Sequence, residues 1–199
     1  MNNDTIFRIL TGLAFGTAFL VVWAYRRRAQ DGESYDLRHE SWPVALALRL
    51  GGLGIWLFPP TYVVFPNWVA WAGIDLPDGV RWAAAAVALF IVPPLVAWAQ
   101  RHLGHNVTTT VVTKENHQLV TSGPYKWIRH PLYTFGLLFF FSIAILSSNW
   151  IPLVAELVVL AALLARLPKE EAKLIERFGD QYRAYAQRTG RFLPKLRLF

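Results

Sequence analysis

The chain has 199 residues, of which 54% are hydrophobic, and it carries a formal net charge of +7 and no cysteine. This length is enough for one domain or one compact helical bundle. The lack of cysteine excludes disulfides, thiolate metal sites and thiol nucleophiles. Charged residues cluster in a few loops and at the C-terminus, and the basic ones flank long apolar runs. That arrangement indicates membrane topology and anionic lipids rather than nucleic acid. We therefore expect an integral, multi-pass membrane protein that binds no nucleic acid.

The first apolar run, Ile6–Tyr25, is followed directly by Arg26, Arg27 and Arg28. A cleaved signal peptide carries its positive charges before the apolar run and has a small-residue cleavage site after it. Because both features are reversed or missing here, the run is interpreted as a retained membrane anchor.

Four further apolar runs could cross a membrane, which requires about 20 mostly apolar residues. These runs are Trp42–Phe65, Val80–Gln100, Pro131–Ser147 and Trp150–Leu167. Pro59-Pro60 predict a break near the far end of the second span, and Pro93-Pro94 predict a kink in the third. Only Ser148-Asn149 join the last two spans. The expected fold class is an all-α membrane protein with five transmembrane helices, of which spans 4 and 5 form a short antiparallel hairpin.

Lys and Arg residues in the loops predict how these spans are oriented. Basic residues occupy the first loop, the third loop and the C-terminal tail, which carries nine of them from Arg166 onward. The second loop has none before Arg81, and the fourth is uncharged. This alternation places the N-terminus outside and the C-terminus in the cytoplasm. Residues 1–199 are expected to form a single membrane domain, with three spans in 1–100 and the functional core in 101–199.

The third loop ends with Gly123-Pro124-Tyr125 and, shortly after, Arg129-His130-Pro131. A proline fits the first turn of a helix, so the fourth span is expected to begin at Pro131. A helix start offers unpaired amide donors and a partial positive charge, which suits a carboxylate or another anion. Basic and aromatic residues at this depth can also be plain topology signals and interface anchors. Topology does not, however, require the Gly-Pro-Tyr string.

An amphipathic helix is predicted in the C-terminal tail. Leu174, Phe178, Tyr182 and Tyr185 recur at steps of four, four and three, which is the spacing of one helix face. Glu171 falls on the same face, where burial is expected. Because a buried carboxylate needs a partner, we expect a cationic ligand or an arginine beside it.

Glu156 is an acidic residue inside the fifth span. Intramembrane carboxylates are candidates for function, but this one lies toward the outer side, away from the third loop. A helix-packing or oligomer contact is favoured over a catalytic role.

Two strings, in order, resemble the isoprenylcysteine carboxyl methyltransferase family. The first comprises Gln118-Leu119-Val120, Gly123-Pro124-Tyr125, Arg129-His130-Pro131 and Tyr133. The second comprises Arg166, Glu170-Glu171, Leu174, Phe178-Gly179, Tyr182, Tyr185, Arg188 and Pro194. The resemblance covers about half of the chain, from Leu103 to Pro194, and does not extend to the first three spans.

The resemblance implies a methyltransferase that uses S-adenosylmethionine, releases S-adenosylhomocysteine and admits a lipophilic or lipidated substrate from the bilayer. It implies a cytoplasmic pocket, and the residues that it assigns to the cofactor are Gln118, Leu119, Val120, Gly123, Tyr125, His130, Tyr133 and Glu171. It assigns Arg129, Arg166 and Glu170 to the catalytic group, with the two arginines orienting the acceptor. No metal site is expected, and the oligomeric state is open.

A carboxylate is the favoured acceptor, because arginine grips a carboxylate at two points and a carboxylate needs no general base at neutral pH. An amine or thiol acceptor would need a base, for which the candidates are His102, His105 and His117. The fold leaves open a phospholipid N-methyltransferase or a thiol S-methyltransferase and, ranked lower, a membrane NADPH reductase or a non-enzymatic scaffold. A short chain that ends at Phe199 is typical of a prokaryotic version in the inner membrane, with a small lipophilic acid or thiol as substrate.

Overall fold

A computed structural model describes residues 3–28, 41–104 and 119–195. Within them the α-helices are α1 Asn3–Arg28, α2 Trp42–Val64, α3 Asp78–Ala86, α4 Val92–Leu103, α5 Pro131–Ser147, α6 Trp150–Phe178 and α7 Asp180–Arg188. Short 3₁₀ turns cover Pro66–Trp68, Ala70–Ala72 and Gly123–Lys126. The predicted all-α architecture is confirmed, and each of the five predicted spans is helical.

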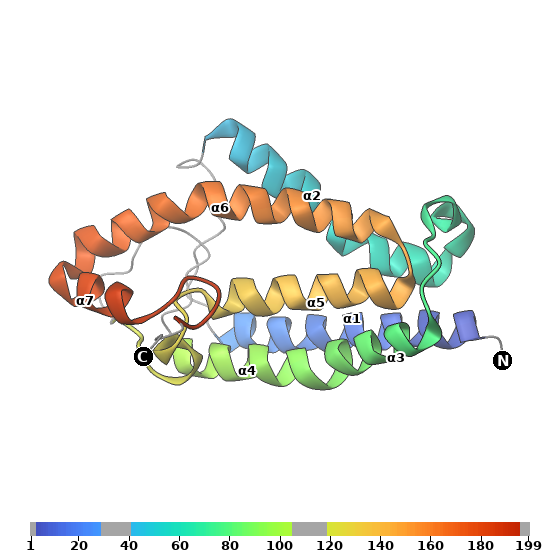
Figure 1. Ribbon diagram of the computed structural model, residues 1–199, viewed down its shortest axis with the longest axis horizontal. Coiled ribbons are helices and arrows are strands. Elements are labelled where there is room, and N and C mark those ends of the chain that lie inside the picture. The colour runs from blue at the N-terminus through green and yellow to red at the C-terminus, as the bar shows by residue number, and fades with distance from the viewer. Residues whose placement is uncertain (1–2, 29–40, 105–118, 196–199) are drawn as a thin grey trace.

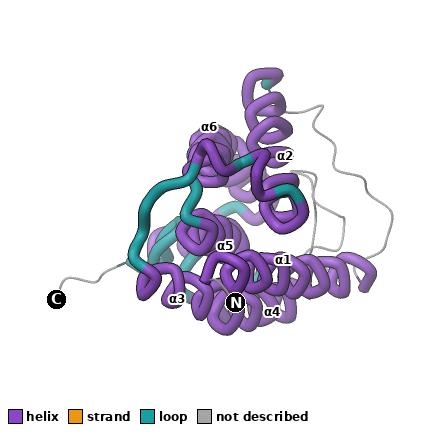
Figure 2. Tube along the Cα trace, turned by 90° about the vertical axis from the view of Figure 1, so that its right-hand side faces the viewer, coloured by secondary structure: helices purple, strands orange, loops and turns teal. Residues whose placement is uncertain are grey.

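The helices form an elongated bundle. α1, α4 and α5 lie side by side along its long axis, α3 leads into α4, α6 packs on α5, and α2 packs on α6 (Figures 1 and 2). The start of α1, the loop 65–76 and the start of α3 lie at one end, called here the α3 end. The segment before α5 lies with α7 at the other, called the α7 end (Figure 1). Aromatic and aliphatic side chains such as Phe58, Val92, Phe139 and Ile143 fill the core between the helices.

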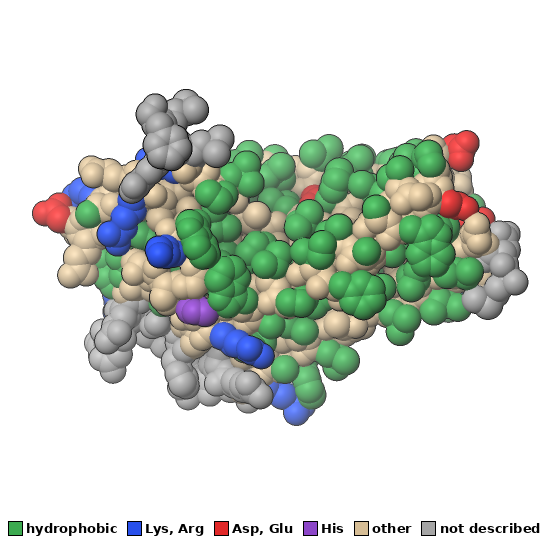
Figure 3. Space-filling model, turned by 60° about the horizontal axis from the view of Figure 1, so that its bottom comes forward, with side chains coloured by type: hydrophobic (Ala, Val, Ile, Leu, Met, Phe, Trp, Pro, Cys, Tyr) green, Lys and Arg blue, Asp and Glu red, His purple; other side chains and the backbone are tan. Residues whose placement is uncertain are grey.

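Four helical segments are long and apolar enough to cross a membrane, and a fifth is apolar but shorter. The four are Asn3–Tyr25, Trp42–Val64, Asp78–Leu103 and Trp150–Phe178, and the shorter one is Pro131–Ser147. Hydrophobic side chains cover the middle of the face shown in Figure 3, while most of its Lys and Arg side chains lie toward the α7 end. Apolar surface of this kind suits lipid rather than water.

The two proline pairs have different effects on their helices. Pro93 and Pro94, near the start of α4, lack amide donors, and the preceding turn Val87–Ile91 between α3 and α4 is π-helical. The predicted break at Pro59-Pro60 is wrong, because α2 continues to Val64. A β-carbon on Gly51 would come within 2.7 Å of Val159 in α6. This close packing supports α2 in spite of its prolines.

The hairpin between α5 and α6 is confirmed as a two-residue connection. Ser148 adopts the left-handed conformation (φ 52°) that ends α5. The Asn149 side chain accepts a hydrogen bond from the Ile151 amide (3.0 Å) and donates one to the Val69 carbonyl (2.8 Å). Asn149 therefore caps α6 and fastens the hairpin to the loop 65–76.

The C-terminal tail is helical, as the sequence predicts, but its predicted amphipathic face does not lie on one uninterrupted helix. α6 continues through Pro168 to Phe178, so the fifth span and the first part of the tail form one helix. The chain then turns at Gly179 (φ 55°) into α7. A left-handed glycine is a common helix terminator. The predicted aromatic face is therefore divided between α6, which carries Leu174, and α7, which carries Tyr182 and Tyr185.

We expect Asn149→Ala to destabilise the protein by about 2–3 kcal/mol, because it removes the cap of α6 and leaves the buried Val69 carbonyl without its hydrogen-bond donor. Thermal unfolding in detergent would measure the change. Asn67→Ala, an exposed position in the same loop, is the matched control. Equal melting temperatures for the two variants would contradict the capping role.

Candidate active site

The third loop and the tail are joined by backbone hydrogen bonds at the α7 end. Ile128 and Gly190 form a parallel bridge. The Arg129 amide donates to the Gly190 carbonyl (2.9 Å), and the His130 amide donates to the Arg191 carbonyl (3.1 Å). The Thr134 hydroxyl at the start of α5 also donates to the Phe192 carbonyl (2.9 Å). The tail segment after α7 is thus held against the start of α5.

Gly190 is required for this joint, because a β-carbon there would overlap the carbonyl oxygen of Leu193. We expect Gly190→Ala to displace the tail, to expose it to protease and to lower the affinity for any ligand bound at the α7 end by tenfold or more. Limited proteolysis of the detergent-solubilised protein would measure the exposure. Gly16→Ala in α1, where no atom lies within 4 Å of the added carbon, should leave the cleavage pattern unchanged. Equal protease resistance in both variants would contradict the prediction.

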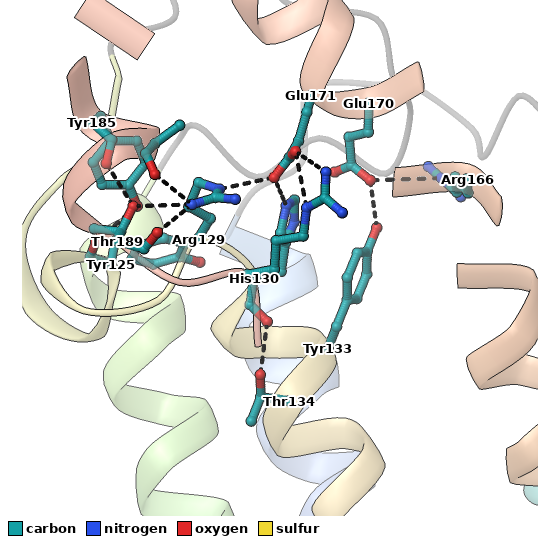
Figure 4. Close-up of polar contacts among 12 residues, drawn as sticks. Tyr125, Arg129, His130, Tyr133, Thr134, Arg166, Glu170, Glu171, Tyr185 and Thr189 are labelled. Atoms are coloured by element: carbon teal, nitrogen blue, oxygen red, sulfur yellow. Dashed lines mark hydrogen bonds and ion pairs between the residues drawn. The ribbon is translucent and has the colours of Figure 1, made fainter. Parts of the chain in front are cut away.

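Glu171 on α6 lies at the centre of a charged cluster (Figure 4). Its Oε1 accepts from Arg129 Nε (2.8 Å) and lies 3.4 Å from His130 Nε2. Its Oε2 accepts from Arg191 Nε (3.1 Å) and Nη2 (2.9 Å). Glu171 is buried, as the sequence predicts, and two arginines are the partners that its charge requires.

Arg129 connects this cluster to the end of α7. Its Nη1 donates to the carbonyls of Ala186 and Thr189. The Thr189 hydroxyl in turn donates to the Tyr185 carbonyl (2.7 Å). Carbonyls at a helix C-terminus lack partners within the helix, and a guanidinium supplies them while also matching the helix dipole. The geometry gives Arg129 a structural role, and its predicted role toward the acceptor stays a prediction.

A second cluster is centred on Glu170. Tyr133 Oη donates to Glu170 Oε2 (3.1 Å), and Arg166 Nε lies 3.8 Å from the same oxygen (Figure 4). Arg166 is buried, with 6% of its surface exposed. Arg166 and Glu170 are four residues apart on α6, which places them on one face of the helix. The stacked rings of Tyr133 and His130, with centroids 5.5 Å apart, lie between the two clusters.

Three tyrosines support the joint between the loop and the tail. The Tyr185 hydroxyl donates to the Tyr125 carbonyl (2.7 Å). Burial raises the pKa of Tyr185 to about 12, so this hydroxyl remains a donor at neutral pH. Burial also raises the pKa of Tyr125 and of Tyr182. The tyrosines therefore contribute packing and, through the Tyr185 hydroxyl, a hydrogen bond, but no charge.

Gly123 is held against a histidine at the end of α4. It has a positive φ (59°), and a β-carbon there would overlap the His102 ring. His102 Nδ1 lies 3.0 Å from the Trp98 carbonyl. His102 therefore packs against the start of the turn Gly123–Lys126.

The structure places the predicted site residues in two groups. Those that it brings together at the clusters and the joint are Tyr125, Arg129, His130, Tyr133, Arg166, Glu170 and Glu171. Leu119, Val120 and Gly123 lie on the segment that leads into this joint, and Val120 packs against the core. Gln118, His105 and His117 lie outside the described residues.

Arg191 and Thr189 contact the cluster although the sequence did not single them out. Thr189-Gly190-Arg191 follow the end of the helical periodicity. The only signal there is a glycine beside an arginine, which is too common a pattern to mark a site.

Two other features lie apart from the clusters. Glu156 is buried in α6, about 21 Å along the helix from Glu170 at 1.5 Å per residue. Among the described residues, no group of three histidines, aspartates and glutamates could hold a metal ion.

Residues 83–176 match the family model of the isoprenylcysteine carboxyl methyltransferase (ICMT) family. The match begins in α3 rather than at Leu103, so it includes most of the third span, and it ends before Phe178. Both Glu170 and Glu171 lie inside it, whereas α7 and the tail after it lie outside.

Several named relatives also match part of the chain. Protein-S-isoprenylcysteine O-methyltransferase B of Arabidopsis thaliana is 39% identical over 82 residues, which is 41% of this chain and 42% of the relative. Protein-S-isoprenylcysteine O-methyltransferase of Rattus norvegicus is 32% identical over 120 residues, 58% of this chain and 42% of the relative. Methanethiol S-methyltransferase 1 of Bradyrhizobium diazoefficiens is 32% identical over 92 residues, 45% of this chain and 32% of the relative.

In each case the match spans less than half of the relative's length. The matched region of this chain holds both carboxylates of the paired clusters together with Arg129, His130 and Arg166. Residues 83–176, just under half of the chain, are therefore similar to the isoprenylcysteine carboxyl methyltransferase family.

Proposed function

We propose that the protein transfers a methyl group from S-adenosylmethionine to a lipophilic acceptor, with a carboxylate as the favoured acceptor group. The observation that carries the proposal is the pair of clusters centred on Glu170 and on Glu171, two carboxylates that lie inside the segment that matches the family. The reaction would take place at the α7 end of the bundle.

The residues present fit the cofactor in chemical type. S-adenosylmethionine supplies a methyl group on a positively charged sulfur. Aromatic faces and carboxylates stabilise such a cation, and here the stacked rings of His130 and Tyr133 lie beside Glu170. We propose that these three residues and Glu171 hold the cofactor, together with Leu119, Val120, Gly123, Tyr125 and Gln118 from the preceding loop.

Arg166 would orient the acceptor. Its planar guanidinium can bind a carboxylate at two points, which a lysine cannot do. Since a carboxylate is already ionised at neutral pH, the site has to align the two reactants and exclude water rather than remove a proton. Glu170, 3.8 Å from Arg166, would hold the guanidinium in place. Arg129 would act mainly as a positioning residue, because Glu171 and the end of α7 already engage it.

An apolar cavity supports a lipophilic substrate. It has a volume of about 80 Å³ and lies among α1, α2, α4 and α5. Its lining includes Gly136, Phe139 and Phe140, and Gly136 is within one helical turn of Tyr133. A small apolar group of the substrate in this cavity would lie within about one helical turn of Tyr133.

The proposed orientation places the α7 end in the cytoplasm and the start of α1 outside. It rests on the basic residues near the α7 end and on Asp4, Asp75 and Asp78 at the α3 end, because cytoplasmic loops are enriched in Lys and Arg.

Calorimetry in detergent with S-adenosylmethionine and S-adenosylhomocysteine tests the cofactor assignment. Saturable heat with both compounds is expected, and its absence with both would overturn the proposal. Incubation with radiolabelled methyl donor and a panel of lipophilic acids, thiols and amines then tests the acceptor. A base-labile product is expected, since methyl esters hydrolyse in base whereas thioethers and methylamines do not.

Thiol methylation is the second candidate, because one relative is named as a methanethiol S-methyltransferase. It would appear as base-stable label in the thiol arm of the same panel, with none in the acid arm.

A further inference from the structure

Of the three arginines in the two clusters, Arg191 has no role in the proposed methyl transfer. It lies in the tail segment after α7, and its side chain is 51% exposed, against 9% for that of Arg129. Arg166 is buried and is assigned to the acceptor. Glu171 and the end of α7 already engage Arg129. Arg191 is therefore the most accessible of the three to a ligand.

The backbone of Arg191 is held in place independently of its side chain. Its carbonyl accepts a hydrogen bond from the His130 amide (3.1 Å), and the Gly190 carbonyl accepts one from the Arg129 amide (2.9 Å). The ring of Phe192, the next residue, packs near the His130 ring with centroids 6.3 Å apart. The tail thus has anchors besides the guanidinium, which leaves that group available to a ligand.

The ion pair with Glu171 uses one edge of the Arg191 guanidinium. Nε and Nη2 both donate to Glu171 Oε2, at 3.1 and 2.9 Å. A guanidinium has five N–H donors in a planar fork, so those of Nη1 and one of Nη2 remain. Within the described part of the chain, no residue accepts a hydrogen bond from Nη1. The edge formed by Nη1 and Nη2 presents two parallel donors, which match the two oxygens of a carboxylate.

The charges of the two clusters indicate the same ligand group. Glu170 and Glu171 supply two negative charges and the three arginines supply three positive ones, so one positive charge is in excess. S-adenosylmethionine carries a sulfonium, an ammonium and one carboxylate. The two glutamates and the aromatic rings suit its cationic groups. The residues proposed above to hold it include no arginine or lysine for its carboxylate.

We propose that Arg191 binds the carboxylate of the cofactor's methionine part through its Nη1–Nη2 edge, while Glu171 holds the adjacent Nε–Nη2 edge. This inference rests on the proposed use of S-adenosylmethionine. Arg191 is in this arrangement a binding residue and takes no part in the transfer itself. Because the carboxylate is retained when the methyl group leaves, Arg191 contributes to the affinity for S-adenosylhomocysteine as it does for S-adenosylmethionine.

Calorimetry in detergent with decarboxylated S-adenosylmethionine, which keeps both cationic groups but lacks the carboxylate, tests this role. Arg191→Gln is expected to bind S-adenosylmethionine and S-adenosylhomocysteine tenfold or more weakly than wild type. The same variant should bind the decarboxylated compound at least as tightly as wild type, since it loses no carboxylate contact and one positive charge is removed. Arg191→Lys, which keeps the charge, should recover part of the lost affinity.

Arg183→Gln, at an exposed position of α7, is the matched control and should bind all three compounds as wild type does. Equal weakening of all three compounds in Arg191→Gln would show a purely structural role and would overturn the inference. Unchanged affinity for S-adenosylmethionine in that variant would overturn it as well. Both outcomes would leave the proposed function standing, whereas a wild type that bound none of the three compounds would overturn the proposed function and the role of Arg191 together.

Discussion

Glu171→Gln is expected to weaken S-adenosylmethionine binding by about 10–100-fold and to destabilise the protein by about 3 kcal/mol, as breaking a buried ion pair does. The substitution keeps the shape of the side chain but leaves Arg129 and Arg191 without their shared anion. Without it, the tail loses an anchor on α6 and the proposed cofactor site loses a negative charge. Calorimetry and thermal unfolding in detergent would measure the two effects.

Glu176→Gln is the matched control, because Glu176 is an exposed glutamate on the same helix. It should leave both quantities within error of wild type. Wild-type cofactor affinity in Glu171→Gln, with the fold intact, would contradict the proposed role of Glu171.

Arg166→Lys is expected to lower turnover by about 10²–10³-fold, the usual effect of removing one preorganised charged donor from an active site, while cofactor affinity changes less than threefold. Lysine keeps the positive charge but cannot bind a carboxylate at two points. Single-turnover transfer of labelled methyl to the best acceptor found in the panel would measure the rate, and calorimetry would measure the affinity.

The control for this variant is Arg183→Lys, on the exposed face of α7. It should not change the rate. If Arg166→Lys instead lost cofactor binding while Glu171→Gln retained it, the proposed roles of the two residues would have to be exchanged.

The two motifs, one in the third loop and one in the tail, could be recognised from the sequence because the residues of each motif lie within a short stretch of the chain. The buried carboxylate at Glu171 was predictable as well, since helical spacing placed it among aromatic residues. Its partner could be narrowed to an arginine or a cationic ligand. Arg191 could not be identified as a partner of Glu171. It follows Gly190 in a non-helical segment, where no helical spacing indicates which side chains are buried.

The predicted break in the second span did not occur. The proline pair in α2 suggested a helix end, yet α2 runs to Val64. The local sequence shows that a proline removes an amide donor from the helix. It does not show that a neighbouring helix, here α6 packed against Gly51, stabilises α2 in spite of its prolines.

The sequence by itself determined the all-α membrane fold, the five apolar helices and the region of the proposed site, because apolar length, charge placement and short motifs are local properties. Only the tertiary structure decided that Arg129 holds the end of α7 and that Glu170 and Glu171 serve two separate clusters. Each of these depends on groups brought together from distant segments by packing, and no spacing along the chain encodes them.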